Sequence, residues 1–121
     1  MADNPENYSP EKRYKYLLEQ VVEHNCIWIL TDEHGCVMLN SEDEDCVPIW
    51  PNEAYALAWA TGEWASCRAE SVSLAKWQSR WTNGLLDDEL CLAVFPNQDE
   101  EGLVVYPDEF DYELSRQLKK Q

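Results

Sequence analysis

The feature that most constrains the fold is a pair of short apolar runs separated by a polar turn. Residues 26–30 and 36–39 are apolar, and Asp32-Glu33-His34-Gly35 lies between them. Glycine supplies the positive φ that a tight reversal requires, so this pattern predicts a β-hairpin. The apolar runs at 91–95 and 103–106 flank a second polar turn and predict a second hairpin. Two hairpins favour a mainly antiparallel or mixed sheet.

Four helices are expected in the remaining sequence. They are predicted at residues 10–24, 51–62, 73–83 and 107–120. Ser9 and Ser73 precede the first and third helices, where a hydroxyl accepts a hydrogen bond from a helical N–H. Pro10 fits the first helical position, because its missing N–H has no partner there in any helix. Gly84 is expected to end the third helix.

The middle of the chain gives weaker signals. Residues 46–50 form an apolar segment whose Pro48 cannot donate to a ladder, which indicates an edge position or a bulge. The alanine-rich helix that follows is expected to pack through a stripe formed by Ala54, Leu57 and Ala58. Residues 63–70 alternate weakly and predict a strand or an extended arm.

The length of the chain bounds the number of domains. With 121 residues, of which 45% are hydrophobic, the chain suits one domain with one core. We therefore expect a single α+β domain over residues 9–121, with about five strands and about four helices packed on the sheet. Residues 1–8 are expected to be a disordered N-terminal segment.

Negative charge dominates the composition and is unevenly placed. The chain has 24 Asp and Glu against 9 Lys and Arg, a formal charge of −15. Neither Lys nor Arg occurs between Lys15 and Arg68, or between Arg80 and Arg116. These two base-free tracts contain Glu19, Glu23, Asp32, Glu33, Glu42, Asp43, Glu44, Asp45, Glu53 and Glu63, then Asp87, Asp88, Glu89, Asp99, Glu100, Glu101, Asp108, Glu109, Asp111 and Glu113. Such a surface repels nucleic acid and anionic membranes and attracts basic protein surfaces. The alternative is that the charge serves only to keep the protein soluble.

Cysteine usage and hydropathy indicate the compartment. No stretch approaches the ~18 apolar residues that cross a bilayer. The cysteines are Cys26, Cys36, Cys46, Cys67 and Cys91. They are odd in number and include no Cys-x-x-Cys pair, so we expect reduced thiols in a cytoplasmic protein. A monomer or weak dimer is expected.

The candidate binding residues are tryptophans next to acids. Trp50, Trp59 and Trp64 bracket the alanine-rich helix, and Trp59 falls off its expected packing stripe. An exposed indole beside carboxylates would anchor a basic partner, because aromatic residues dominate interface hot spots and attract cations. The alternative for each indole is core packing. The acids of this hypothetical site are Glu42, Asp43, Glu44, Asp45 and Glu63.

Residues suited to catalysis or metal binding are few. His24 and Cys26, with His34 and Cys36, could supply four zinc ligands. A hairpin turning at residues 32–35 would place the two cysteines about 16 Å apart, too far for one ion. No nucleophile, phosphate-binding or zinc-protease motif occurs, so the sequence predicts neither enzyme nor cofactor nor metal site.

Three functional hypotheses remain open. The leading one is a non-enzymatic, acidic protein-interaction domain with an immunity-like or regulatory role. The first alternative is a nucleic-acid mimic that occupies a DNA-binding protein, which requires carboxylates spaced like phosphates over one face. The second is an enzyme with a small pocket that contains His34 and Cys36.

Several segments together resemble one protein family. They are residues 14–22, 27–30 with Gly35, 45–51 with Tyr55-Ala56, 62–64 and 94–97. The most specific element is Pro48-x-Trp50-Pro51 followed by the small-residue helix. This pattern is similar, over about residues 10–110, to small bacterial proteins known as domain of unknown function 2750. The resemblance implies a bacterial cytosolic protein in which Pro48, Trp50, Pro51 and Trp64 mark a shared structural or binding element, and it supplies no activity.

Overall fold

The computed structural model describes residues 8–33, 35–41, 44–97 and 102–119. The elements are α1 (Pro10–His24), β1 (Cys26–Asp32), β2 (Gly35–Cys36), β3 (Leu39–Ser41), β4 (Glu44–Ile49), α2 (Glu53–Trp59), the 3-10 turn η2 (Gly62–Trp64), β5 (Arg68–Ser73), α3 (Leu74–Lys76), the π-helical turn η3 (Trp77–Trp81), α4 (Thr82–Asp87), β6 (Cys91–Val94), β7 (Leu103–Val105) and α5 (Pro107–Lys119). Of the segment expected to be disordered, residues 1–7 lie outside these ranges. Tyr8 is described, and its ring packs edge-on against Tyr16.

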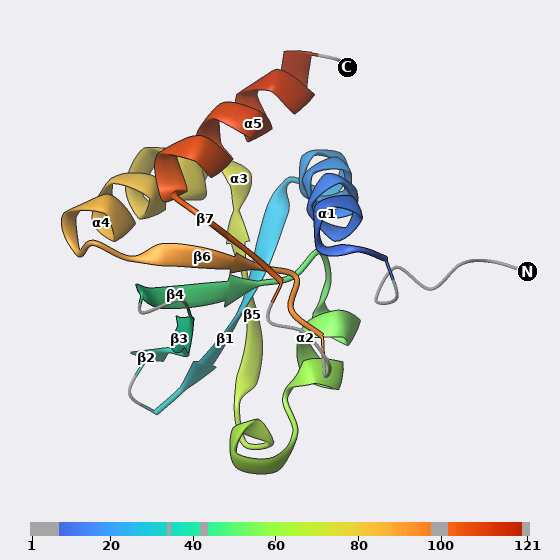
Figure 1. Ribbon diagram of the computed structural model, residues 1–121, viewed down its shortest axis with the longest axis vertical. Helices are drawn as coiled ribbons and strands as arrows, with labels where there is room; N and C mark the ends of the chain where they lie inside the picture. Colours follow the sequence, from blue (N-terminus) through green and yellow to red (C-terminus); the bar gives the residue numbers. More distant parts are fainter. Residues whose placement is uncertain (1–7, 34, 42–43, 98–101, 120–121) are drawn as a thin grey trace, which may run out of the picture.

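The described strands form two small sheets linked by a bridge. One sheet has the order β2-β1-β5 and the other β3-β4-β6-β7. Two backbone hydrogen bonds between Trp28 and Trp50, at 3.1 and 2.9 Å, connect the sheets. Helices α1, α4 and α5 lie together on one side, whereas α2 and η2 lie at the opposite end (Figure 1). The predicted α+β class is confirmed, with two linked sheets in place of the single sheet expected.

The longest ladder joins segments that are distant in the sequence. Strands β1 and β5 pair antiparallel from Cys26↔Ser73 to Thr31↔Arg68, whereas β1 and the predicted hairpin partner β2 share two pairs. The weak strand signal at 63–70 therefore belongs to the main partner of β1, shifted toward Ser73. A hairpin signal depends on local turn residues, so it could not reveal this partner.

Strand β4 is central although it contains a proline. It pairs with β3 on one side and runs parallel to β6 on the other, with Pro48 opposite Ala93. The Ile49 carbonyl accepts a hydrogen bond from Phe95, so the backbone of Pro48 points away from β6. On that side Pro48 lies between the last β3 pair, at Cys46, and the bridge at Trp50. The expected edge strand is thus wrong for β4, and the proline occupies a gap between ladders.

Segments α3, η3 and α4 form one continuous helical stretch. Ser73 caps it as predicted, accepting a hydrogen bond from the N–H of Lys76 at 3.2 Å. The expected stop at Gly84 is wrong, because the helix continues to Asp87 and the following Glu89 adopts the positive φ instead. Thr82 donates from both its N–H and its hydroxyl to the carbonyl of Trp77, which produces the π turn.

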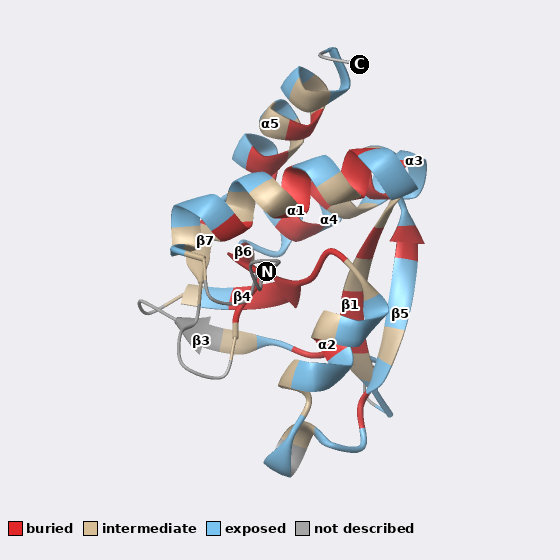
Figure 2. Ribbon diagram, turned by 90° about the vertical axis from the view of Figure 1, so that its right-hand side faces the viewer, coloured by how far each residue is buried: buried red, intermediate tan, exposed pale blue. Residues whose placement is uncertain are grey.

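The predicted packing stripe of α2 is also wrong. Ala54, Leu57 and Ala58 are exposed, and the buried residue of the helix is Ala56. Figure 2 shows most of α2 and η2 as exposed or intermediate, in contrast to the buried strands β4 and β6. Aromatic rings decide the orientation of this helix, because Trp59 packs on buried Trp50 and thereby turns the small residues outward.

Helix α1 follows the sequence prediction closely and carries one buried charge. Ser9 caps it, and Asn25 ends it with a left-handed φ of 59°. Arg13 is wholly buried, and its guanidinium donates to the carbonyls of Phe95 at 3.0 Å and Tyr8 at 2.6 Å. The guanidinium therefore links the start of α1 to the end of β6.

Candidate functional site at the indole groups

The three candidate tryptophans form one stack. The Trp50 and Trp59 rings are 5.4 Å apart, and the Trp59 and Trp64 rings are 5.8 Å apart and nearly parallel at 30°. We refer to Trp50, Trp59 and Trp64 as the Trp50 stack. Its rings come from three segments, the end of β4, helix α2 and turn η2. The stack runs from the core outward, since Trp50 is buried and the other two are half-buried.

Trp50 is part of the hydrophobic core. Its side chain is 0% exposed, and its indole N–H donates to the carbonyl of Pro96 at 3.1 Å. Core packing, the alternative that the sequence left open, therefore holds for Trp50, and it offers no exposed ring to a partner. Trp59 and Trp64 are half-buried, and Leu57, which belongs to the same helix as Trp59, is 46% exposed.

Local sequence explains how α2 is held against the stack. Asn52 caps the helix by accepting a hydrogen bond from the N–H of Tyr55 at 2.9 Å. The Tyr55 ring packs on Phe95 at 5.0 Å, so the helix is fixed to the core at both ends. Gly62, with φ of 60°, lets the chain reverse into η2 and brings Trp64 back over Trp59.

The acids predicted for this site are separated from it. Glu42 and Asp43 lie outside the described residues, as does the side chain of Glu63. Glu44 begins β4, six residues before Trp50, which places it about 20 Å along the strand. The structure therefore does not bring the described part of the acidic run to the Trp50 stack.

Glu44 has a different partner on β6. Its carboxylate accepts a hydrogen bond from the thiol of Cys91. Burial, this hydrogen bond and the negative charge raise the pKa of Cys91 to about 12. Glu44 and exposed Asp45 line a cleft of about 510 Å³ together with Glu89. Among the residues that the structure describes, no group of three metal-ligating side chains converges.

The pairing of β1 with β2 tests the distance predicted between the two cysteines of the zinc hypothesis. Cys36 is opposite Thr31, five residues along β1 from Cys26, so the two cysteines lie at opposite ends of the strand as predicted. His34 and the side chain of Cys36 lie outside the described residues, and the small-pocket hypothesis stays a prediction. The thiol of Cys67 is buried, and burial followed by the charge of Asp32 raises its pKa.

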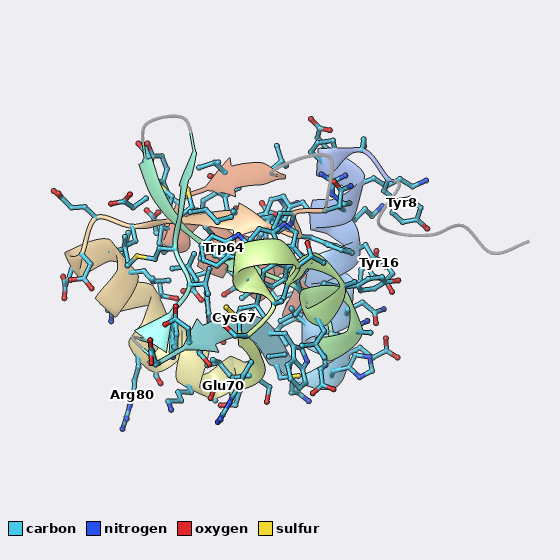
Figure 3. The ribbon with its side chains drawn as sticks, turned by 90° about the horizontal axis from the view of Figure 1, so that it is seen from below. Tyr8, Tyr16, Trp64, Cys67, Glu70 and Arg80 are labelled. Atoms are coloured by element: carbon cyan, nitrogen blue, oxygen red, sulfur yellow. The ribbon has the colours of Figure 1, made fainter. Side chains whose placement is uncertain are left out.

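Three basic residues, Lys12, Arg116 and Arg68, have different surroundings. Lys12 lies 4.4 Å from the centre of the Tyr8 ring, and Arg116 pairs with Glu113 at 3.3 Å. Arg68 lines a hollow of about 540 Å³ with Asp32, Glu33 and Glu70, so this part of the surface carries both charges. Seen from below, Glu70 and Arg80 lie toward one edge of the molecule, whereas Trp64 and Cys67 lie nearer its middle (Figure 3).

Sequence reasoning missed a second indole group. Trp77 and Trp81 lie 5.2 Å apart and nearly parallel, at 8°, and we refer to them as the Trp77 pair. Trp77 is wholly buried, whereas Trp81 is half-buried and lines a groove with Lys76 and Arg80. The available signal was the four-residue spacing of Lys76, Arg80 and Gly84, which places them along one side of a helix.

The fold and these surfaces define an acidic α+β domain with two indole groups that reach the surface. The chain belongs to the family described as Protein of unknown function (DUF2750), whose model matches residues 14–114. The resemblance seen in the sequence is thereby confirmed. Comparison with curated proteins and with solved structures gave no match. In the part of the chain that the structure describes, no helix is long and apolar enough to cross a membrane.

Proposed function

We propose that this protein is a non-enzymatic interaction domain of the bacterial cytoplasm, with an immunity-like or regulatory role, that binds a basic protein surface through α2 and η2. One observation carries the proposal. The apolar face formed by Ala54, Leu57 and Ala58 is exposed to solvent, on a helix that half-buried Trp59 holds against the core. Apolar surface rimmed by polar groups is typical of protein-binding sites.

The rigidity of this face supports a binding role. Trp59 rests on fully buried Trp50, whose ring is held by the hydrogen bond to Pro96. A partner would therefore meet a surface that is already ordered, which reduces the entropy lost on association. Tryptophan is among the residue types that most often dominate the binding energy of an interface.

The charge around α2 supports a basic partner. Exposed Glu53 lies in the first turn of the helix, and the sequence from residue 16 to residue 67 contains no Lys or Arg. Arg68, the next base along the chain, lines the hollow that it shares with Asp32 and Glu70. A cationic surface would supply the counter-charge that this part of the chain lacks.

The thiols support a non-enzymatic role. The pKa values of Cys67 and Cys91 are both raised, which disfavours the thiolate that a cysteine nucleophile requires. Within the described residues Cys26, Cys46, Cys67 and Cys91 are thiols rather than disulfides, which suits a reducing cytoplasm.

The test is capture of a basic partner by immobilised protein at about 50 mM and about 500 mM salt. We expect one stoichiometric basic protein at low salt, with most of it lost at high salt. Leu57→Ser should reduce capture at least tenfold, because Leu57 is the large apolar side chain of the exposed face. Leu118→Ser is the matched control, since Leu118 is an exposed leucine on α5 and 37% exposed.

Two outcomes would contradict the proposal. Capture that is equal for the wild type and Leu57→Ser would remove α2 from the interface. Failure to retain any stoichiometric basic protein at either salt concentration would remove the partner. Displacement of the partner by duplex DNA would instead favour the nucleic-acid mimic, because such a mimic and DNA compete for one basic surface.

A further inference from the structure

A groove lined by two basic residues lies beside the Trp77 pair, in contrast to the base-free sequence around α2. Its volume is about 440 Å³, within the range of small-molecule sites. It is lined by Met38, Val47, Lys76, Arg80, Trp81, Gly84, Leu85, Asp88 and Leu90. These residues come from the α3-η3-α4 stretch and the connection that follows it, from β4 and from the connection after β2. It shares no residue with the surface proposed to bind a protein.

The floor of the groove is apolar and firmly supported. Val47 and Leu85 are buried side chains of the core. Trp81 lies flat against Trp77, which is itself 0% exposed, so its ring is held in place from behind. Met38, which is 52% exposed, is a flexible and polarisable side chain that can adapt to a bound apolar group.

Gly84 is a second observation that points to a ligand. It lies inside α4, where glycine is less favourable than alanine, and it is not the helix stop. A Cβ built at this position meets no atom within 4 Å. Neither a positive φ nor close packing therefore accounts for the glycine, and its missing side chain leaves the groove open at this point.

Charge along the groove is ordered. Lys76, Arg80, Gly84 and Asp88 repeat every four residues, and Lys76 and Asp88 are about 18 Å apart along the helix. The two cations therefore lie at one end and the carboxylate at the other. The π turn between Trp77 and Trp81 lies beside the cationic end, and such turns occur frequently at functional sites.

We propose that this groove binds a small amphipathic carboxylate. Its apolar body would lie over Gly84 against Trp81 and Leu85, and its carboxylate would contact Lys76 and Arg80. Arg presents a planar donor pair that matches a carboxylate, and Lys adds a point charge. Asp88 disfavours a second anionic group at the far end, so the ligand carries one negative charge.

The probe is 8-anilinonaphthalene-1-sulfonate, a fluorescent aromatic monoanion, displaced by decanoate or by decan-1-ol. We expect a single binding site on the full chain, from which decanoate displaces the probe at concentrations about tenfold lower than decan-1-ol. Equal potency of the acid and the alcohol would overturn the proposal, because it would show that the cations do not recognise the ligand.

Two variants locate the site. Gly84→Leu places a side chain in the open space and should abolish displaceable probe binding. Arg80→Gln should weaken decanoate binding about tenfold and leave the affinity for decan-1-ol unchanged. Arg116→Gln is the matched control, because it removes an exposed arginine from α5. Far-UV circular dichroism confirms folding of each variant, and Arg80→Gln, at an exposed position, tests the proposal even if Gly84→Leu fails to fold. Unchanged decanoate affinity in Arg80→Gln would overturn it.

Discussion

The Trp50 stack and the Trp77 pair each lead from a fully buried indole to half-buried rings, yet they are assembled differently. The Trp77 pair lies four residues apart on one helical stretch, so helix geometry alone brings its rings together. The Trp50 stack needs β4, α2 and η2 to be in place at once. Its outer rings lie in a base-free part of the chain, whereas Trp81 lies near two cations. Similar aromatic surfaces can thus be set up for opposite charges.

The largest expected effects come from removing the buried ring of each group. Trp50→Ala and Trp77→Ala should each lower the free energy of unfolding by about 3–5 kcal/mol, because each leaves a large cavity in a close-packed core. Urea denaturation followed by circular dichroism measures both. A loss below about 1 kcal/mol at either site would show that its group is not anchored in the core.

A smaller change separates the two anchors. The Trp50 indole donates to Pro96, whereas the Trp77 indole N–H is buried without a hydrogen-bond partner among the described residues. Trp50→Phe should therefore cost about 1–3 kcal/mol more than Trp77→Phe, because it leaves the Pro96 carbonyl unpaired. The same denaturation series measures the difference. Equal costs would mean that water replaces the lost donor.

Rising pH tests the two buried thiols whose pKa values are raised, Cys91 and Cys67. An exposed thiol titrates near pH 9, whereas the pKa of folded Cys91 is raised to about 12. The contribution of the protonated Cys91 thiol to the free energy of unfolding is therefore full below pH 9, and it is lost as the pH rises toward 12. Relative to Cys91→Ala, the wild type should lose on the order of 1 kcal/mol per pH unit above pH 9.

The matched variant in this titration is Cys67→Ala, near Trp64. The pKa of Cys67 is also raised, first by burial and then by Asp32, so the loss should have the same sign. Urea denaturation from about pH 8 to about pH 10 gives the comparison. A wild type that follows both alanine variants at every pH would contradict the predicted shifts.

The smallest effects concern one glycine beside each group. Gly84→Ala should stabilise the protein by up to about 1 kcal/mol, because alanine favours the helix and meets open space. Gly62→Ala should destabilise it by about 1 kcal/mol, because residue 62 has a φ of 60°. Thermal unfolding of both variants checks the opposite signs. A stabilising Gly62→Ala would show that η2 can form without this backbone conformation.

Elements with local signals could be predicted from the sequence. The start of α1 was found because Ser9 and Pro10 mark it directly, and the β6–β7 hairpin because its strands are neighbours in the chain. The pairing of β1 with β5 could not be found in this way, since no local residue records which distant segment completes a ladder. Gly84 was misread because a glycine after a helical pattern is usually a stop signal.

The candidate site could be predicted from the sequence only in part, because its position depends on both local and distant contacts. Trp59 and Trp64 were selected by their position around an alanine-rich helix, and both reach the surface. The orientation of α2 was predicted wrongly, since spacing alone does not reveal that Trp59 outcompetes small residues for the core. The acidic run was joined to the tryptophans by nearness in sequence, whereas an extended β4 carries Glu44 away from them.

The parallel pairing of β4 with β6 has a consequence for how the chain folds. Residues 50–90 lie between these strands and contain five of the six tryptophans. The ladder can close only after this long loop has lost its conformational entropy, so the central pair is expected to form late and slowly. Tryptophan fluorescence would then report loop closure rather than early collapse, and a ribosome-bound chain would keep one side of β4 unpaired until β6 emerged.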